Sequence, residues 1–196
     1  MKHFLWLCIL LTALVRSGWA ASEPVAYFDA GNPIKYDGTK FYLAWSAHPQ
    51  DIYYLQEYLP KGETLERYTQ MFTVSVIFWD RTPEAAVRAK VAELERRRET
   101  DKVCRYLVAE NPDKPGEYIL EFIVSDGRDG VLDCVEVDIH YYRQVVIDGK
   151  KASLLCFYSR RAYGDDILPF MKTIPERRNG WYEGMTRLGM VPRFPK

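Results

Sequence analysis

The sequence predicts an α+β domain, a single antiparallel sheet of about six or seven strands with two or three helices packed mainly on one face. Two observations predict this class. Segments that alternate between apolar and polar residues follow one another through short connections rich in Asp, Gly and Pro, as in an antiparallel meander. Residues 82–99 instead carry apolar side chains at helical spacing, as expected for a helix that packs on a sheet.

The longest of these patterns predicts a hairpin from Val131 to Tyr163. Its turn is Asp148-Gly149, a pair that tolerates the positive φ angles of a type I′ turn. The first arm alternates between an apolar side, with Val135, Val137 and Ile139, and a polar side, with Glu136, Asp138 and His140. This alternation indicates a half-buried strand whose polar face meets solvent.

The remaining elements are expected from similar patterns along the chain. The other strands are expected at residues 25–29, 34–46 (a hairpin or bent strand around Asp37-Gly38), 51–59, 73–79, 103–109, 118–124 and 152–163. A short helix is expected to begin at Thr64, and the clearest helix to begin at Thr82 with Pro83 in its first turn. A last helix should follow Asp165-Asp166 and end or kink near Ile174, because Pro175 comes next.

The N-terminus has the features of a secretory signal peptide over residues 1–20. A short basic start precedes an apolar run, and Gly18 and Ala20 supply the small residues that a signal peptidase requires. We expect cleavage between Ala20 and Ala21, and the apolar run is too short for a permanent membrane anchor. The sequence therefore predicts a periplasmic or secreted protein without a transmembrane span, with residues 21–196 as a single α+β domain.

The charge balance gives no sign of a nucleic-acid partner. The chain has 27 basic and 27 acidic residues, and the leader holds two of the basic ones, Lys2 and Arg16, and no acidic one. Cleavage therefore leaves 27 − 2 = 25 basic against 27 acidic residues, a formal charge of −2. Such a chain lacks the basic surplus typical of nucleic-acid binding proteins.

The cysteines remaining after cleavage are Cys104, Cys134 and Cys156, an odd number. A two-residue turn at Asp148-Gly149 would place Cys156 opposite Tyr141 and put Cys134 on the other face of the sheet. These two cysteines could not then form a disulfide. A bond from Cys104 to either of them stays open, and we expect no disulfide.

One block of the chain carries a resemblance. Residues 53–78, YYLQEYLPKGETLERYTQMFTVSVIF, resemble a block of small exported bacterial proteins of unknown function. The order of elements, with hairpins before a helix and a meander after it, is similar to the PsbP-like α+β fold. That resemblance implies a scaffold for binding and assembly, and it supplies no catalytic residues.

Catalytic and metal-binding signatures are weak. Only His48 and His140 follow the leader, the G-x-S-x-G motif is missing, and Cys134 and His140 would lie about 20 Å apart on one strand. We expect no cofactor and no metal.

Tyrosine and tryptophan are in excess, and such side chains often line binding surfaces. The candidate binding residues are Tyr53, Tyr54, Tyr58, Tyr142 and Trp181.

The favoured interpretation is a non-catalytic binding or assembly module that holds a protein, peptide or lipidic ligand of the cell envelope. The alternative is a small exported hydrolase whose Cys, His and carboxylate groups converge only in space. An enzyme should place His48 or His140 within about 3.5 Å of a cysteine or carboxylate inside a pocket.

Overall fold

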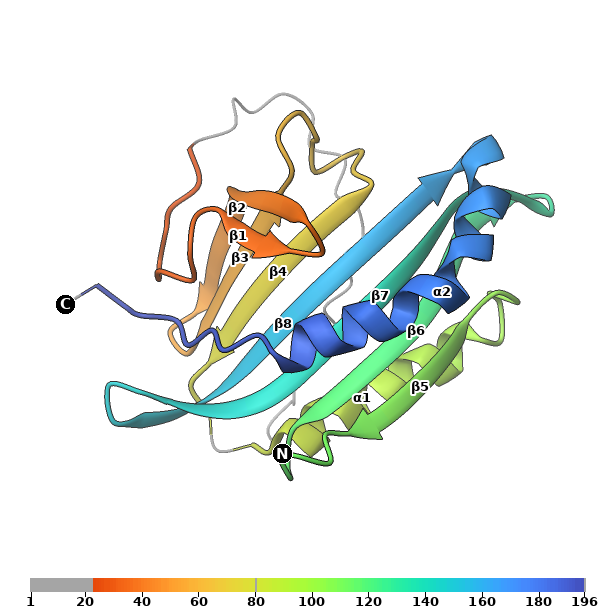
Figure 1. Cartoon of the computed structure of the whole chain (residues 1–196). Helices are drawn as coiled ribbons and strands as arrows, with labels where there is room; N and C mark the ends of the chain where they lie inside the picture. The colour runs from red at the N-terminus through yellow and green to blue at the C-terminus, as the bar shows by residue number, and fades with distance from the viewer. Residues whose placement is uncertain (1–22, 80, 196) are drawn as a thin grey trace, which may run out of the picture.

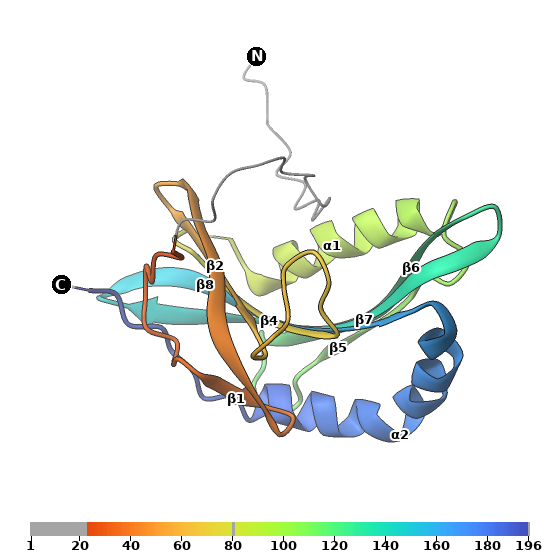
Figure 2. The ribbon, with the colours of Figure 1, turned by 90° about the horizontal axis from the view of Figure 1, so that it is seen from above.

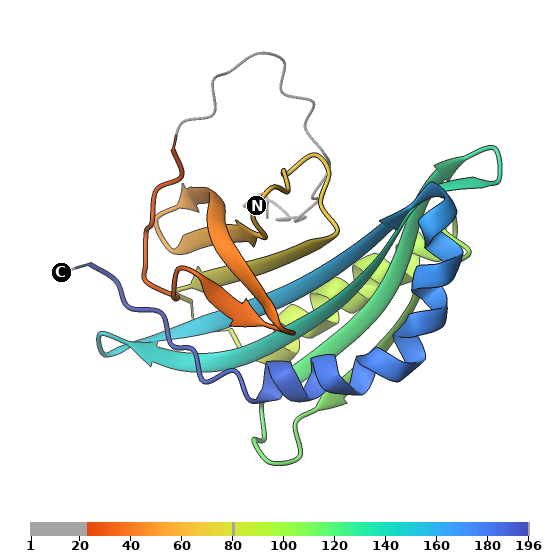
Figure 3. The ribbon, with the colours of Figure 1, turned by 45° about the horizontal axis from the view of Figure 1, so that its top comes forward.

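A strongly curled antiparallel sheet dominates the structure, a computed structural model that describes residues 23–79 and 81–195 (Figure 1). In these residues the sheet has eight strands in the order β1-β2-β3-β4-β8-β7-β6-β5. The sheet bends into a half barrel (Figure 3). The predicted signal peptide, residues 1–20, lies outside the described residues.

The elements follow the chain in two meanders separated by a helix. The strands are β1 (Ile34–Tyr36), β2 (Thr39–Gln50), β3 (Tyr53–Leu59), β4 (Gln70–Ile77), β5 (Arg105–Glu110), β6 (Tyr118–Arg128), β7 (Val131–Ile147) and β8 (Lys150–Tyr163). The helices are α1 (Pro83–Arg97) and α2 (Ile167–Thr186), and a short 3₁₀ turn, η1 (Gly164–Asp166), leads into α2. None of the described helices is long and apolar enough to span a membrane.

The predicted fold class is wrong in two respects. The sheet has eight strands within the described residues rather than six or seven, and strands hold 47% of the chain against 22% for helices. The helices α1 and α2 also lie on opposite faces of the sheet instead of sharing one face (Figure 2). The error arose because the polar side of β7 was taken to face solvent, whereas α1 packs over it.

The β7–β8 hairpin is confirmed and occupies the middle of the sheet. Asp148 and Gly149 both have positive φ angles, 48° and 75°, as a type I′ turn requires. The register places Cys156 opposite Tyr141 as predicted. The outer side of β8 pairs with β4, so this one hairpin joins the two meanders into a continuous sheet.

Each face of the sheet carries its own hydrophobic core. On the concave face, α2 and β1 cover a core that includes Phe41, Phe72, Ile139, Tyr158 and Trp181. On the other face, α1 covers a second core that includes Val87, Leu94, Leu120, Phe122 and Leu155. The central strands are therefore buried on both sides, which leaves only the ends and edges of the sheet open for ligands.

The turn between β1 and β2 anchors α2 on the concave face. Asp37 Oδ2 accepts hydrogen bonds from Trp181 Nε1 at 3.0 Å, from Tyr158 Oη at 3.1 Å and from Arg177 Nη2 at 3.2 Å. The Tyr36 hydroxyl donates to the carbonyl of Trp181 at 2.6 Å. These contacts hold the helix beyond Pro175, which lies inside α2 and does not end it. The helix changes direction part-way along its length (Figure 3).

The short helix expected from Thr64 does not form. Residues 60–69 make an irregular loop in which the Glu63 carboxylate accepts from the backbone N–H of Thr69 at 2.8 Å and from its hydroxyl at 2.6 Å. This local side-chain bonding satisfies backbone groups outside a helix, so it competes with helix formation. The predicted strand 25–29 is also not formed, although Asp29 makes a single β-bridge with Arg193.

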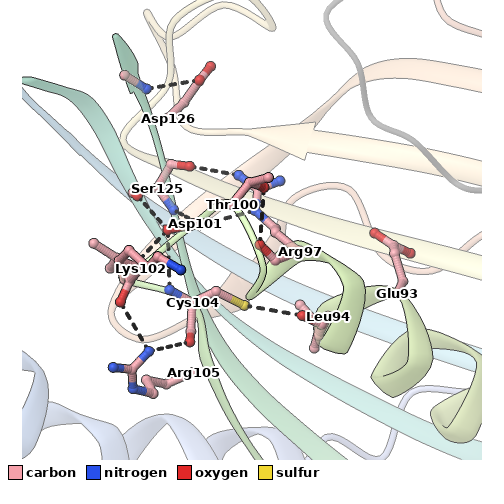
Figure 4. Close-up of polar contacts among 12 residues, drawn as sticks. Glu93, Leu94, Arg97, Thr100, Asp101, Lys102, Cys104, Arg105, Ser125 and Asp126 are labelled. Atoms are coloured by element: carbon pink, nitrogen blue, oxygen red, sulfur yellow. Dashed lines mark hydrogen bonds and ion pairs between the residues drawn. The ribbon is translucent and has the colours of Figure 1, made fainter. Parts of the chain in front are cut away.

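Helix α1 begins as predicted, and its C-terminal end is tied down by Asp101. The Thr82 side chain caps its start by accepting from the N–H of Ala85. Beyond the helix, the Asp101 carboxylate accepts from the backbone N–H and the hydroxyl of Ser125, both at 2.7 Å (Figure 4). Arg97 bonds to Asp101 and to the Ser125 carbonyl. These bonds join α1 to β6.

We predict that Asp101→Asn lowers the free energy of unfolding by about 1–3 kcal/mol, because an amide cannot accept all the bonds that the carboxylate accepts. Burial raises the pKa of Asp101, but the hydrogen bonds from Ser125 and Arg97 outweigh it and hold the pKa below its ordinary value. Urea denaturation at neutral pH measures the effect. The exposed Asp113→Asn is the control, and equal losses in both variants would contradict this role.

Candidate functional site

A row of polar side chains on β7 lies buried under α1. Asp138 is 4% exposed and His140 is 7% exposed, and Glu136 next to them is also largely covered. The expectation that this face of the strand meets solvent is therefore wrong. The row needs partners from other elements, because buried charged groups are stable only when they are paired and hydrogen-bonded.

Glu136 and Asp138 find those partners on β8 and on the loop 60–69. Arg161 Nε donates a hydrogen bond to Glu136 Oε2, and the Tyr68 hydroxyl donates to the same oxygen at 2.9 Å. The Arg161 guanidinium also lies 4.1 Å from the centre of the Tyr68 ring. The Ser159 hydroxyl donates to Asp138 Oδ1. Burial, followed by the nearby Asp138 charge, raises the pKa of Glu136 to about 7.

His140 is held in its neutral form. Burial, and then the positive charge of Lys90 on α1, lower its pKa well below the ordinary value. Its Nδ1 lies 3.0 Å from the Tyr142 hydroxyl, and its ring stacks on Phe157 with 3.7 Å between centroids. Its Nε2 lies 3.7 Å from Asp138 Oδ1, which is longer than a hydrogen bond.

Glu57 on β3 is a further buried acid on this face. It is 3% exposed, and its Oε1 has no hydrogen-bond partner among the described residues. Burial raises its pKa to about 7, and the positive charge of Arg161 opposes that rise only in part. Asp138 Oδ2 is likewise unpartnered within the described part of the chain, and burial raises the Asp138 pKa. Burial thus raises the pKa of both carboxyls, and that of Glu57 to about 7.

The two histidines are not placed as the hydrolase alternative requires. Neither His140 nor His48 lines the cavity beside Phe28 or the groove beside Val87, and His48 stacks on Tyr54 at 4.0 Å between centroids. Burial raises the thiol pKa of Cys104, of Cys134 to about 11 and of Cys156 to about 12, so these cysteines are protonated at neutral pH. All three are free. Across residues 23–79 and 81–195, no group of three His, Cys, Asp or Glu side chains could hold a metal ion.

A cavity of about 340 Å³ lies at one end of the concave face, between the two terminal segments of the described chain. The N-terminal segment, residues 23–33, and the C-terminal segment, residues 188–195, form two of its walls, and β2 and β3 form the floor. The lining includes Phe28, Gly31, Leu43, Gln56, Tyr58 and Phe194.

The polar side chains on the floor of this cavity, Gln56 and Tyr58, already have protein partners. The side-chain amide of Gln56 donates to the Phe28 carbonyl and accepts from the Phe28 N–H, both at 3.2 Å. The same amide is within hydrogen-bond distance of the Tyr58 hydroxyl. The remaining wall is mainly aromatic and aliphatic, so the cavity suits an apolar occupant.

The two terminal segments meet at the border of the cavity, which is partly open to solvent. Asp29 and Arg193 exchange backbone hydrogen bonds of 2.8 and 3.0 Å, and their side chains form an ion pair of 2.7 Å. Phe194 packs on Phe28, Tyr54 and Phe78, with ring centroids 4.9 to 5.5 Å apart. The contacts between the two segments are thus the backbone bonds and the ion pair of Asp29 with Arg193, and the packing of Phe194 on Phe28.

The five candidate binding residues are divided between the two faces. Tyr58 lines the cavity, and Tyr54 packs on Phe194 at its wall. Trp181 belongs to α2 and anchors it to Asp37. Tyr53 and Tyr142 lie in the core under α1. A binding role for these five residues stays a prediction. Phe28 and Phe194 were not among the predicted binding residues, and each lies in an irregular segment that carries no pattern pointing to the cavity.

Comparison with known proteins places the chain in a family. Residues 28–190 match the sequence model of one protein family. The chain belongs to this uncharacterised family. No curated protein and no solved structure matches the chain. The match covers the entire sheet and both helices, and the comparisons add no support for the PsbP-like resemblance.

We predict that Glu57→Gln makes stability less dependent on pH. The Glu57 carboxyl titrates near 4.5 in the unfolded chain and near 7 in the fold. Its contribution to stability is therefore complete below about pH 4.5 and is lost as the pH rises through about 7. Relative to the natural chain, the variant should gain about 2–3 kcal/mol between pH 5 and pH 8. Urea denaturation at the two pH values measures this difference.

The exposed Glu66→Gln is the matched control for this experiment. The comparison between variants is needed because His140 acts in the opposite direction. Its lowered pKa means that unfolding takes up a proton at acid pH. A stability difference between Glu57→Gln and the natural chain that is the same at both pH values would contradict the account.

Proposed function

We propose that this chain is an exported, non-catalytic binding protein of the cell envelope that holds the single acyl chain of a lipidic ligand between its terminal segments. The observation that carries the proposal is the apolar cavity of about 340 Å³ whose walls include both ends of the described chain. Export rests on the predicted signal peptide, residues 1–20, which would direct the protein to the periplasm or the exterior.

The size and chemistry of the cavity select this ligand class. A volume of about 340 Å³ is at the lower end of small-molecule sites, so it suits one acyl chain rather than a lipid with several. The Gln56 amide is occupied by Phe28, so the floor offers no free group for a polar ligand. A polar headgroup would instead lie at the rim, beside the exposed pair Asp29 and Arg193.

The closing contacts allow the ligand to enter without unfolding of the sheet. The Asp29 and Arg193 side chains are 55% and 83% exposed, and ion pairs of this kind contribute about 0–1 kcal/mol. The other contacts between the two segments are the two backbone bonds and the packing of Phe194 on Phe28. Contacts at a chain end open at a lower free-energy cost than the sheet itself.

The hydrolase alternative has less support. Its groups would have to meet in a pocket, whereas His140 and its carboxylate neighbours are enclosed between α1 and the sheet. The thiols are also protonated at neutral pH, which removes the nucleophile that such a reaction needs.

We predict that a dansyl-labelled fatty acid binds with a blue shift and increased emission, and that Leu43→Trp weakens this binding at least tenfold. Leu43 points into the cavity from β2, and a tryptophan there would fill the space of the acyl chain. The matched control is Val131→Trp, at a 66% exposed position next to the turn between β6 and β7. Fluorescence titration measures the affinity, and circular dichroism checks that each variant is folded.

The titration separates the possible outcomes. Binding that Leu43→Trp abolishes and Val131→Trp leaves unchanged supports the proposal. A probe that fails to bind the natural chain, or that binds equally to both variants, would overturn the assignment of this cavity.

A further inference from the structure

Strand β5 forms an open edge of the sheet. It is the last strand in the order and pairs only with β6 within the described chain. Its outer backbone N–H and C=O groups therefore have no strand partner among the described residues. Two apolar side chains lie in the middle of the strand, Leu107 at 50% and Val108 at 37% exposure.

Natural sheets usually protect such an edge, because it is a template for another strand. Here the charged residues Arg105 and Glu110 stand only at the ends of β5, and the centre is apolar. The opposite edge of the sheet is formed by β1, which has only three residues, and by β2 beyond Phe41, which the N-terminal segment contacts at Leu43 and Ser46. The length and composition of β5 thus make it the more suitable edge for added pairing.

A groove of about 390 Å³ lies beside this edge, on the face covered by α1. Val87, Val91 and Ala92 of α1 form one wall, and Val108 and Tyr118 of the sheet form the other. Figure 1 shows α1 running behind β5 and β6. Glu84 and Arg88 lie at the groove and are paired with each other at 2.6 Å, so the wall presents no unpaired charge from these two.

The register shows how the edge and the groove would act together. Val108 is opposite Leu120, whose side chain belongs to the core under α1, so alternate residues of β5 point to this face. A strand added beside β5 would point every second side chain to the same face, because side chains alternate along a strand. Those side chains would reach Val108 and the wall of α1.

We propose that the β5 edge binds an extended segment of a partner protein as an additional strand, with uncharged apolar side chains at alternate positions entering the groove between α1 and β5. Backbone pairing with β5 would supply much of the affinity, and the groove would select the alternate apolar residues. This site is separate from the cavity between the terminal segments, so a negative result at one site has no bearing on the other.

The test uses a blocked synthetic peptide, Lys-Val-Thr-Val-Thr-Val-Lys, and the same peptide with its valines replaced by aspartate. We expect the valine peptide to bind the full chain and to slow amide hydrogen exchange along β5, and the aspartate peptide to bind at least tenfold more weakly. Val108→Asp should weaken the valine peptide at least tenfold. Val146→Asp, at a position 64% exposed on β7, is the matched control and should bind like the natural chain.

Several results would overturn the proposal. These are no binding of the valine peptide, equal binding by Val108→Asp, or protection on β1 and β2 instead of β5. Concentration-dependent dimerisation in sedimentation, abolished by Val108→Asp, would also overturn it, because the edge would then serve a second copy of the chain. Circular dichroism confirms that each variant is folded before it is titrated.

Discussion

The pairing of β8 with both β4 and β7 is the interaction on which the rest of the structure depends. Within the described residues, the β4–β8 pair is the only strand pairing between the two meanders. Because β8 is central, both of its faces are buried, with Cys156 and Tyr158 in the concave core and Leu155 in the core under α1. Each helix then has a separate apolar face to cover, which explains why α1 and α2 lie on opposite sides (Figure 2).

This arrangement has a cost in electrostatics. The polar side of β7, which carries Glu136, Asp138 and His140, is enclosed by other elements. Of these side chains, Glu136 has Arg161 and Tyr68 as hydrogen-bond partners. Burial therefore raises the pKa of both carboxyls, that of Glu136 to about 7, and lowers the pKa of His140. The network specifies how β7, β8 and the loop 60–69 fit together, and it makes stability sensitive to pH.

Because both faces of the sheet are covered, open binding sites remain only at its ends and edges. One cavity lies between the terminal segments at one end of the concave face. Strand β5 leaves one edge unpaired within the described chain. The two sites differ in chemistry, since the cavity offers mainly apolar walls and the edge offers backbone groups without a strand partner among the described residues. The two proposed sites therefore do not compete for the same ligand.

Local features of the fold could be predicted from the sequence, whereas features set by distant contacts could not. Asp148-Gly149 and the cap at Thr82 act through their own neighbours, so the hairpin register and the start of α1 were correct. The burial of Asp138 depends on α1 and on Ser159, which are remote in the chain. The sequence allowed the last helix either to end or to kink near Ile174, and helix α2 continues through Pro175, with its later turns held by Asp37, which is far away in sequence.

The cavity between the terminal segments also depends on contacts between residues far apart in the sequence. Tyr58 could be suggested from the aromatic excess, but the cavity also needs Phe28 and Phe194, which come together only when the two terminal segments meet. The most direct test is a crystal structure of the protein with a fatty acid brominated at its terminal carbon. We expect the bromine anomalous peak between Phe28, Leu43 and Phe194. A peak elsewhere on the protein, or an ordered cavity with no ligand at saturating concentration, would contradict the account.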